Sequence, residues 1–236
     1  MASTSPHPTK RPSGRAIAIA FGIAIGAAVV LVAVALLLRN GDSTPAARAT
    51  PVVDLGGIPQ AGSTLGSPSA KVTLIEYADP QCPACRFYTE TIFPTVVDEY
   101  VRPGKVATEY RGFPFIGDDS VKGYRYLLAA ARQGKLWSLM EALYRNQGAE
   151  NSGWLTEDLV RRLAAEVPGL DVDQLLSDAE HPDVVEEASN AASKASAAGI
   201  QGTPTFLVKV GDSTPYLIQV ASVEDVRAAL DDALSG

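Results

Sequence analysis

An uncharged apolar run from Ala16 to Leu38 is the feature that most restricts how this chain folds. As an α-helix, a run of this length is roughly 34 Å long, and the hydrocarbon core of a bilayer is about 30 Å thick. The run is therefore predicted to be one transmembrane helix. Three basic residues, Lys10, Arg11 and Arg15, precede it with no acidic residue among them. The positive-inside rule then places residues 1–15 in the cytoplasm and everything after the helix outside it.

A cleaved signal peptide is the alternative interpretation of the same run. The stretch TPAARAT at 44–50 contains a small-residue A-x-A pattern at Ala47 and Ala49. The apolar core of a signal peptide is usually only about 7 to 15 residues long, and this pattern lies well beyond the end of the run. An uncleaved membrane anchor is favoured, with secretion after cleavage as the alternative.

The rest of the chain divides into a linker and one domain. Residues 39–51 are rich in Ser, Thr, Pro, Ala and Gly, which is typical of a flexible linker, and the domain is expected at 52–236. Residues 1–50 hold five Lys or Arg and one Asp, so the part that follows has 15 basic and 26 acidic residues, a net charge of −11. This acidic domain lacks the basic patch that nucleic acid requires, and nucleic-acid binding is excluded.

Hydrophobic periodicity within the domain predicts an α/β fold. Residues 56–70 are expected to form turns or a short hairpin before the main elements. Pro94 is expected to kink the first helix, while Thr156 and the pair Ser222 and Asp225 indicate helix starts. The expected elements are, in chain order, strand 71–78, helix 83–101, strand 106–115, a helical block at about 118–199, strands 205–210 and 216–220, and a last helix.

Both cysteines of the chain, Cys82 and Cys85, lie in the stretch DPQCPACRFYTE at 79–90. A bridge between them closes so short a loop that it contributes little as a structural disulfide. A zinc site needs three or four ligands, and beyond this pair the chain has only His7 and His181. Metal binding is therefore not expected, and a redox role is favoured.

The position of the pair favours thiol exchange. Cys82 is expected at the N-cap of the helix that Pro83 opens, where unpaired N–H groups and the helix dipole stabilise a thiolate. A stabilised thiolate is a reactive nucleophile and a good leaving group. Cys85, one turn inward, is placed to attack a mixed disulfide formed at Cys82, so the two cysteines are sufficient for a complete exchange cycle.

Three features together resemble the DsbA-like branch of the thioredoxin superfamily. They are TLIEYADPQCPACRFY, with its C-P-A-C motif between a strand and a helix, GIQGTPTFLV near the C-terminus, and the helical block between the two strand pairs. The resemblance covers roughly residues 52–235. It implies a thioredoxin-like fold, β-α-β then β-β-α, with a large helical insertion at about 118–199, preceded here by the transmembrane helix.

The resemblance also implies roles for particular residues. Cys82 matches the exposed nucleophile and Cys85 the buried resolving thiol. Glu76 matches a buried acid that assists proton transfer to or from Cys85, although the alternating pattern of its strand also allows a carboxylate that faces solvent. Thr203 and Pro204 match the cis-proline loop that faces the cysteines, where the backbone of Thr203 is available to pair with an extended substrate peptide.

One position departs from the family pattern. Many DsbA-like oxidases have His as the second residue between the cysteines, where it stabilises the thiolate, and this chain has Ala84 there. A weaker oxidant than the strongest members is therefore expected.

The function implied by the resemblance is that of a disulfide-donating oxidase that acts on the thiols of unfolded or exported proteins. Its only redox group is the Cys82–Cys85 disulfide, with no other cofactor. A quinone-linked membrane enzyme, DsbB-like or VKOR-like, is the implied reoxidising partner. A disulfide reductase or isomerase is the alternative within the same chemistry. From a different class, the alternative is a tethered binding or chaperone-like module whose cysteine pair is inert.

Overall fold

The computed structural model describes residues 53–236 of the chain. The expected cytoplasmic segment (1–15), transmembrane helix (16–38) and linker (39–51) lie outside this range. Among the helices of residues 53–236, none combines the length and the apolar character needed to cross a membrane.

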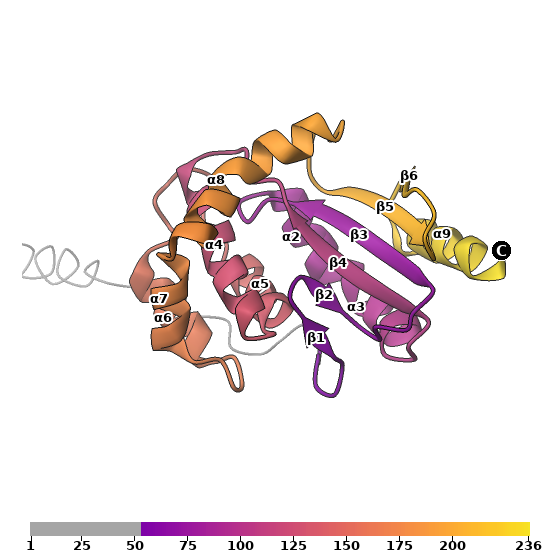
Figure 1. Ribbon diagram of the computed structural model, residues 1–236, viewed down its shortest axis with the longest axis horizontal. Coiled ribbons are helices and arrows are strands. Elements are labelled where there is room, and N and C mark those ends of the chain that lie inside the picture. Colours follow the sequence, from indigo (N-terminus) through magenta and orange to yellow (C-terminus); the bar gives the residue numbers. More distant parts are fainter. Residues whose placement is uncertain (1–52) are drawn as a thin grey trace, which may run out of the picture. The chain divides into compact units, whose positions relative to one another are not determined.

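A mixed six-stranded sheet forms the centre of the described domain (Figure 1). Its strand order is β1-β2-β4-β3-β5-β6, in which β3 and β4 are parallel and every other neighbouring pair is antiparallel. The hairpin expected within 56–70 is confirmed, and its strands extend the sheet beside β4. The strands are β1 (Gln60–Ala61), β2 (Thr64–Leu65), β3 (Val72–Ala78), β4 (Val106–Gly112), β5 (Thr205–Val210) and β6 (Tyr216–Ile218).

The helices confirm the predicted order, with a helical insertion between β4 and β5. In Figure 1 the insertion lies to the left of the sheet and the C-terminal helix α9 to the right. Before the insertion lie α2 (Pro83–Thr91), α3 (Phe93–Val96) and a π-helical turn η1 (Val97–Val101). The later helices are α4 (Asp118–Arg132), α5 (Leu136–Arg145), α6 (Glu157–Ala165), α7 (Val172–Ala179), α8 (Pro182–Ala197) and α9 (Val223–Ser235).

Three predicted elements differ from the structure: one helix is interrupted, and two strands end earlier than expected. The helix expected at 83–101 is interrupted at Ile92, because Pro94 cannot donate the next helical hydrogen bond. The interruption confirms the kink predicted at Pro94. The strand expected at 106–115 ends at Gly112, before Pro114, and the one expected at 216–220 ends at Ile218.

The predicted helix starts are confirmed. The Thr156 hydroxyl accepts a hydrogen bond from the N–H of Leu159 at 3.2 Å and caps α6. At α9, Ser222 Oγ accepts from the N–H of Asp225 at 3.2 Å, and Asp225 Oδ2 accepts from the N–H of Ser222 at 3.0 Å. This reciprocal capping box satisfies two backbone donors that would otherwise lack partners.

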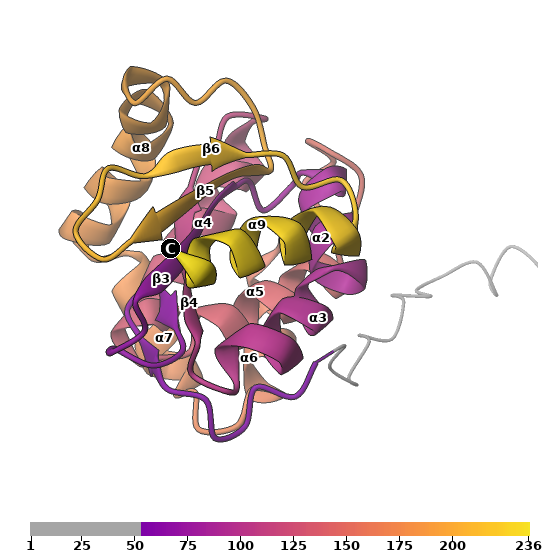
Figure 2. The same cartoon turned by 90° about the vertical axis from the view of Figure 1, so that its right-hand side faces the viewer.

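The central strand β3 is buried on both faces, as expected for the middle of a sheet that helices cover on both sides. On one face, Leu74 and Glu76 face the larger core beneath α2, α3 and α9; Figure 2 shows α3 and α9 together on this face. On the other face, Ile75 and Tyr77 form a smaller apolar cluster with Ala195 of α8. Alternate residues of one strand therefore serve two different layers.

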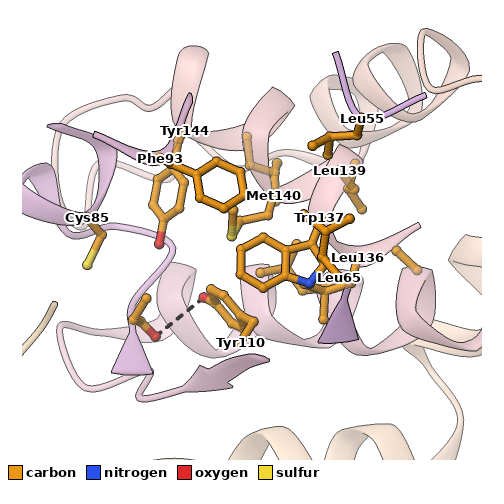
Figure 3. Packing of buried hydrophobic residues seen from close by; sticks show 14 of the residues in the cluster. Leu55, Leu65, Cys85, Phe93, Tyr110, Leu136, Trp137, Leu139, Met140 and Tyr144 are labelled. Carbon is orange, nitrogen blue, oxygen red and sulfur yellow. Dashed lines mark hydrogen bonds between the residues drawn. The ribbon is translucent and has the colours of Figure 1, made fainter. Parts of the chain in front are cut away.

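The larger core contains a group of aromatic rings around Trp137 of α5. The Trp137 ring stacks on Phe93 with centroids 5.2 Å apart and meets the ring of Tyr110 edge-on at 6.1 Å. Its indole N–H donates to the carbonyl of Ser63 at 3.0 Å, which also ties the N-terminal hairpin to the insertion. Figure 3 shows Cys85 at one side of this cluster, so the helix that carries the cysteines is anchored in the core.

The end of β4 permits a close approach of α4. A Cβ atom at Gly112 would lie only 2.3 Å from Cζ of Tyr124, so no larger residue fits while the tyrosine ring occupies this position. Beside it, the Tyr110 hydroxyl donates to the carbonyl of Ala78 at the end of β3, at 3.4 Å. The ends of the two parallel strands are thereby held together next to the cysteine pair.

Candidate active site

Cys82 lies between the end of β3 and the first turn of α2. Its backbone is extended, with φ −69° and ψ 119°, and it is the N-cap of a helix whose first turn begins with Pro83, as predicted. The N–H of Cys82 donates to the carbonyl of Asp79 at 3.0 Å, and its own carbonyl accepts from the N–H of Arg86 at 3.1 Å. A tight turn followed by a helix start thus fixes the backbone of Cys82.

Both thiols are free, so the structure represents the reduced pair. Cys82 Sγ accepts a hydrogen bond from the N–H of Cys85 at 3.3 Å and donates to the carbonyl of Thr203 at 3.3 Å. Cys85 is fully buried, as predicted, but the expectation of an exposed Cys82 is wrong, since its exposed fraction is 5%. The contacts with the first turn of α2 and with Thr203 leave little of Cys82 exposed.

The surroundings of Cys82 favour its thiolate. The pKa of Cys82 is lowered to about 6, mainly by a hydrogen bond from the Cys85 thiol. The N–H groups of Cys85 and Ala84 lower this pKa further, while burial opposes them. The N–H groups of the helix start contribute as expected, but the Cys85 thiol has the larger effect. Ala84 acts only through its backbone N–H, since its side chain has no donor.

The surroundings of Cys85 have the opposite effect. Burial raises the pKa of the Cys85 thiol well above its usual value, and the hydrogen bond to Cys82 and the charges of Cys82 and Glu76 raise it further. In the reduced pair, the proton is therefore retained by Cys85 and released by Cys82.

Glu76 lies in the interior on the same face of β3 as the cysteine pair, with an exposed fraction of 1%. The alternative of a solvent-facing carboxylate is wrong. Among residues 53–236, neither carboxyl oxygen of Glu76 has a hydrogen-bond partner. Burial, with a smaller effect from the charge of Cys82, raises the pKa of Glu76 to about 8. A carboxyl group in this state can hold or release a proton near neutral pH, although its role in proton transfer stays a prediction.

The Thr203–Pro204 peptide bond is cis, and the loop lies against Cys82 through the Thr203 carbonyl. The loop leads into β5, whose first residue, Thr205, is paired with Tyr77 of β3. The Thr205 hydroxyl donates to the carbonyl of Gly202 at 2.7 Å and closes the loop. The structure therefore brings together the predicted cysteines and the predicted loop, while pairing of a substrate with Thr203 stays a prediction.

Asp79 is a buried residue of the site to which sequence analysis gave no role. Its carboxylate accepts from the N–H groups of Gln81 (2.8 Å), Phe115 (2.9 Å) and Ile116 (3.1 Å) and from the Ser120 hydroxyl (2.6 Å). Four donors compensate for burying this carboxylate. The D-P dipeptide after a strand signals the turn, but nothing local signals the three distant donors.

Other side chains of the insertion also bind this turn. The Gln81 amide donates to the Ser120 hydroxyl at 2.9 Å and to Asn151 Oδ1 at 3.3 Å, and it accepts from the N–H of Asn151 at 2.7 Å. These partners lie 39 and 70 positions from Gln81 in the sequence, so no spacing pattern reveals them. Within the described part of the chain, no three His, Cys, Asp or Glu side chains are arranged to hold a metal ion.

Comparison with known proteins supports the resemblance to the thioredoxin superfamily that the sequence motifs indicated. A family model described as Thioredoxin matches residues 60–232. The chain is 32% identical over 174 residues to a curated protein of Bacillus cereus named "Probable disulfide bond formation protein D", covering 72% of this chain and 78% of the relative. It is 22% identical over 178 residues to "Disulfide bond formation protein D" of Bacillus subtilis, covering 73% and 77% of the two chains.

Two solved structures have a similar fold. The oxidised form of BdbD from Bacillus subtilis matches with a TM-score of 0.64 and 22% identity, over 76% of this chain and 98% of the other. A thioredoxin-like oxidoreductase from Silicibacter pomeroyi matches with a TM-score of 0.57 and 31% identity, over 73% and 92%. The family model, the relative above 30% identity and the cysteine site agree. The chain belongs to the thioredoxin superfamily, as a DsbA-like thiol:disulfide oxidoreductase.

Proposed function

We propose that the protein is an oxidase, which uses a Cys82–Cys85 disulfide to oxidise thiol pairs in exported or unfolded proteins. The observation that carries this proposal is the opposite shift of the two thiol pKa values, with that of Cys82 lowered to about 6 and that of Cys85 raised. A stabilised Cys82 thiolate lowers the free energy of the reduced protein. The corresponding disulfide therefore accepts electrons more readily than one between ordinary thiols.

The proposed reaction has two exchange steps. A substrate thiolate attacks Cys82 Sγ, the Cys82–Cys85 bond breaks, and the Cys85 sulfur leaves with the electron pair and takes up a proton. A second substrate thiolate then attacks the substrate sulfur of the mixed disulfide, and Cys82 leaves as a thiolate. Two electrons have passed from the substrate thiols to the cysteine pair, and the substrate holds a new disulfide.

Glu76 is the proposed source and acceptor of the Cys85 proton. Its pKa of about 8 leaves it largely protonated at neutral pH, so a proton is available when Cys85 leaves. Reoxidation reverses this movement, since Cys85 must lose its proton before it can attack. A carboxylate beside a buried thiol can accept that proton without placing a second charge in the core.

The proposed location is the outer side of a membrane, to which the chain is anchored by its apolar run at 16–38. The positive charges before this run and the oxidising conditions outside the cytoplasm support the proposal. The proposed reoxidising partner is a quinone-linked membrane enzyme, DsbB-like or VKOR-like. No other cofactor is needed, because the cysteine pair itself carries the two electrons.

The decisive experiment equilibrates the full chain, in detergent, with glutathione buffers of graded ratio and measures the oxidised fraction by thiol alkylation. We expect a reduction potential well above the roughly −270 mV of thioredoxin, towards the oxidising end of the superfamily at about −120 mV. A cysteine pair that does not exchange at all would instead support the inert binding module.

A reductase or isomerase is the second candidate, and the absence of a side-chain donor at Ala84 favours it. Fewer donors to Cys82 give a less stable thiolate and hence a less oxidising disulfide. A measured potential near or below about −270 mV would replace the oxidase with this alternative.

A further inference from the structure

The helical insertion holds the turn before α2 through three backbone carbonyls, those of Asp79, Pro80 and Cys82. The Tyr144 hydroxyl donates to the carbonyl of Asp79 at 3.0 Å. Just beyond α5, the Gln147 side-chain amide donates to the carbonyl of Pro80 at 3.0 Å and to that of Cys82 at 3.2 Å. Gln147 thus connects the insertion directly to the backbone of the nucleophilic cysteine.

One of the two carbonyls that Gln147 binds, that of Cys82, also accepts the first hydrogen bond of the helix. The Cys82 oxygen also accepts from the N–H of Arg86 at 3.1 Å, the first hydrogen bond of α2. With two donors on this oxygen, the Cys82 backbone has little freedom to rotate. Rotation would move Sγ away from the N–H of Cys85 and from the Thr203 carbonyl, each 3.3 Å away.

We propose that Gln147 is a positioning residue for thiol exchange, which holds the Cys82 backbone from the helical insertion and keeps its sulfur between the start of α2 and Thr203. In the described residues Gln147 makes no hydrogen bond to the sulfur, so it acts through the two carbonyls. This inference rests on the proposed function, because it concerns the reactivity of the same sulfur. Through Gln147, the helical insertion would influence thiol exchange at Cys82 as well as contribute to the hydrophobic core.

Other hydrogen bonds also hold the turn before α2 in place. Gln81, the residue before Cys82, is fully buried and is held by Ser120 and Asn151, and Asp79 is held by Ser120 and two backbone N–H groups. These bonds are expected to keep the turn folded without Gln147. Loss of the Gln147 amide is expected to loosen Cys82 itself, and not to unfold the turn.

The test is the substitution Gln147→Leu in the full chain, with two measurements. The first is the pKa of Cys82, from thiolate absorbance in the reduced protein as a function of pH. We expect this pKa to rise by about half a unit, because the sulfur is less well aligned with its donors. The second is the equilibrium constant with glutathione, for which we expect a disulfide about two- to threefold less easily reduced.

Gln133→Leu is the matched control. The Gln133 amide also bridges backbone groups within the insertion, donating to the carbonyl of Asp171 at 3.0 Å and accepting from its N–H at 2.8 Å. This substitution removes hydrogen bonds of the same kind without touching the turn before α2. We expect it to lower the unfolding free energy and to leave the pKa of Cys82 and the glutathione equilibrium unchanged.

The outcomes separate the two proposals. If wild type exchanges with glutathione but Gln147→Leu keeps the Cys82 pKa and the equilibrium constant, Gln147 is only structural and this inference is wrong. If wild type does not exchange, the proposed function is wrong. Should Gln147→Leu fail to fold, Gln147→Asn decides, because its amide is one methylene shorter and cannot reach both carbonyls. A shift of the same sign supports the inference, and no shift overturns it.

Discussion

The two cysteines lie one helical turn apart, yet they occupy regions of opposite character. Around Cys82, hydrogen-bond donors converge on the sulfur, from the first turn of α2 and from the Cys85 thiol. Around Cys85 lie apolar side chains and Glu76, a carboxyl group without a hydrogen-bond partner in residues 53–236. Directional donors favour charge in the first region, while burial suppresses it in the second.

A single helix start can therefore give two identical side chains different chemical roles. The N-cap position places one sulfur beside free N–H groups, and a position one turn later directs the other into the core. Neither region would suffice alone, because exchange needs a sulfur that leaves as an anion and another that can take a proton.

The largest effect is expected from exchanging each cysteine for serine. Cys82→Ser should abolish disulfide exchange with a dithiol peptide, because the attacked sulfur is gone. Cys85→Ser, incubated with oxidised glutathione, should accumulate a mixed disulfide at Cys82, because the Cys82 thiolate attacks the glutathione disulfide and displaces one glutathione thiolate, and no Cys85 is present to resolve the product. Mass spectrometry will detect this adduct. Persistent exchange in Cys82→Ser would contradict the assignment of the nucleophile.

Glu76 makes the stability of the reduced protein depend on pH. Its pKa is raised to about 8 in the folded state, so its contribution to stability is complete below pH 4.5 and is lost as the pH rises to about 8. Between pH 5 and pH 8, the unfolding free energy of wild type should fall by roughly 3 kcal/mol relative to Glu76→Gln.

Urea unfolding of the two reduced proteins at both pH values provides this measurement. The comparison between variants cancels the opposite contribution of Cys82, whose lowered pKa adds stability as the pH rises above about 6. Equal pH dependence in wild type and Glu76→Gln would show that Glu76 is not the buried acid described.

The two thiols should also differ in reactivity towards iodoacetamide. In the reduced protein, alkylation of Cys82 should follow a titration with its midpoint near pH 6. At pH 7, Cys82 should react more than about a hundredfold faster than Cys85, since the raised pKa of Cys85 leaves little thiolate. Peptide mapping after brief labelling measures both rates, and similar rates would remove the contrast between the regions.

The smallest effect is expected outside both regions. Ser222→Ala removes the capping box of α9 and should lower the unfolding free energy by about 1 kcal/mol. The pKa of Cys82 should not change, because within the described residues no hydrogen bond or ion pair joins α9 to the turn that carries Cys82. A shifted pKa in this variant would mean that general loss of stability, and not local donors, sets the reactivity of Cys82.

Sequence predicted the parts of the fold whose signals are local. The hydrophobic pattern of 71–78 identified β3, Pro83 marked the start of α2, and the capping box at Ser222 marked α9. The resemblance singled out Pro204 among 16 prolines, and the structure shows its peptide bond to be cis. In each case, the informative residues are neighbours in the sequence.

The features that sequence missed depend on contacts between distant segments. Asp79 has a donor 41 positions away in Ser120, and Gln147 reaches Cys82 across 65 positions, so no periodicity or motif connects them. The burial of Cys82 has the same origin, since Thr203 lies 121 positions further along the chain. Local patterns identified the reactive group, whereas long-range packing determined its surroundings.

The close contact between Gly112 and Tyr124 has an evolutionary consequence. Because a Cβ at position 112 would overlap the tyrosine ring, a larger residue there becomes acceptable only if position 124 first becomes smaller. The two positions should therefore covary among related sequences, and their intermediates should be rare. Any lineage that crosses this barrier would gain space beside the ends of β3 and β4, and with it the freedom to reshape the wall next to the cysteines.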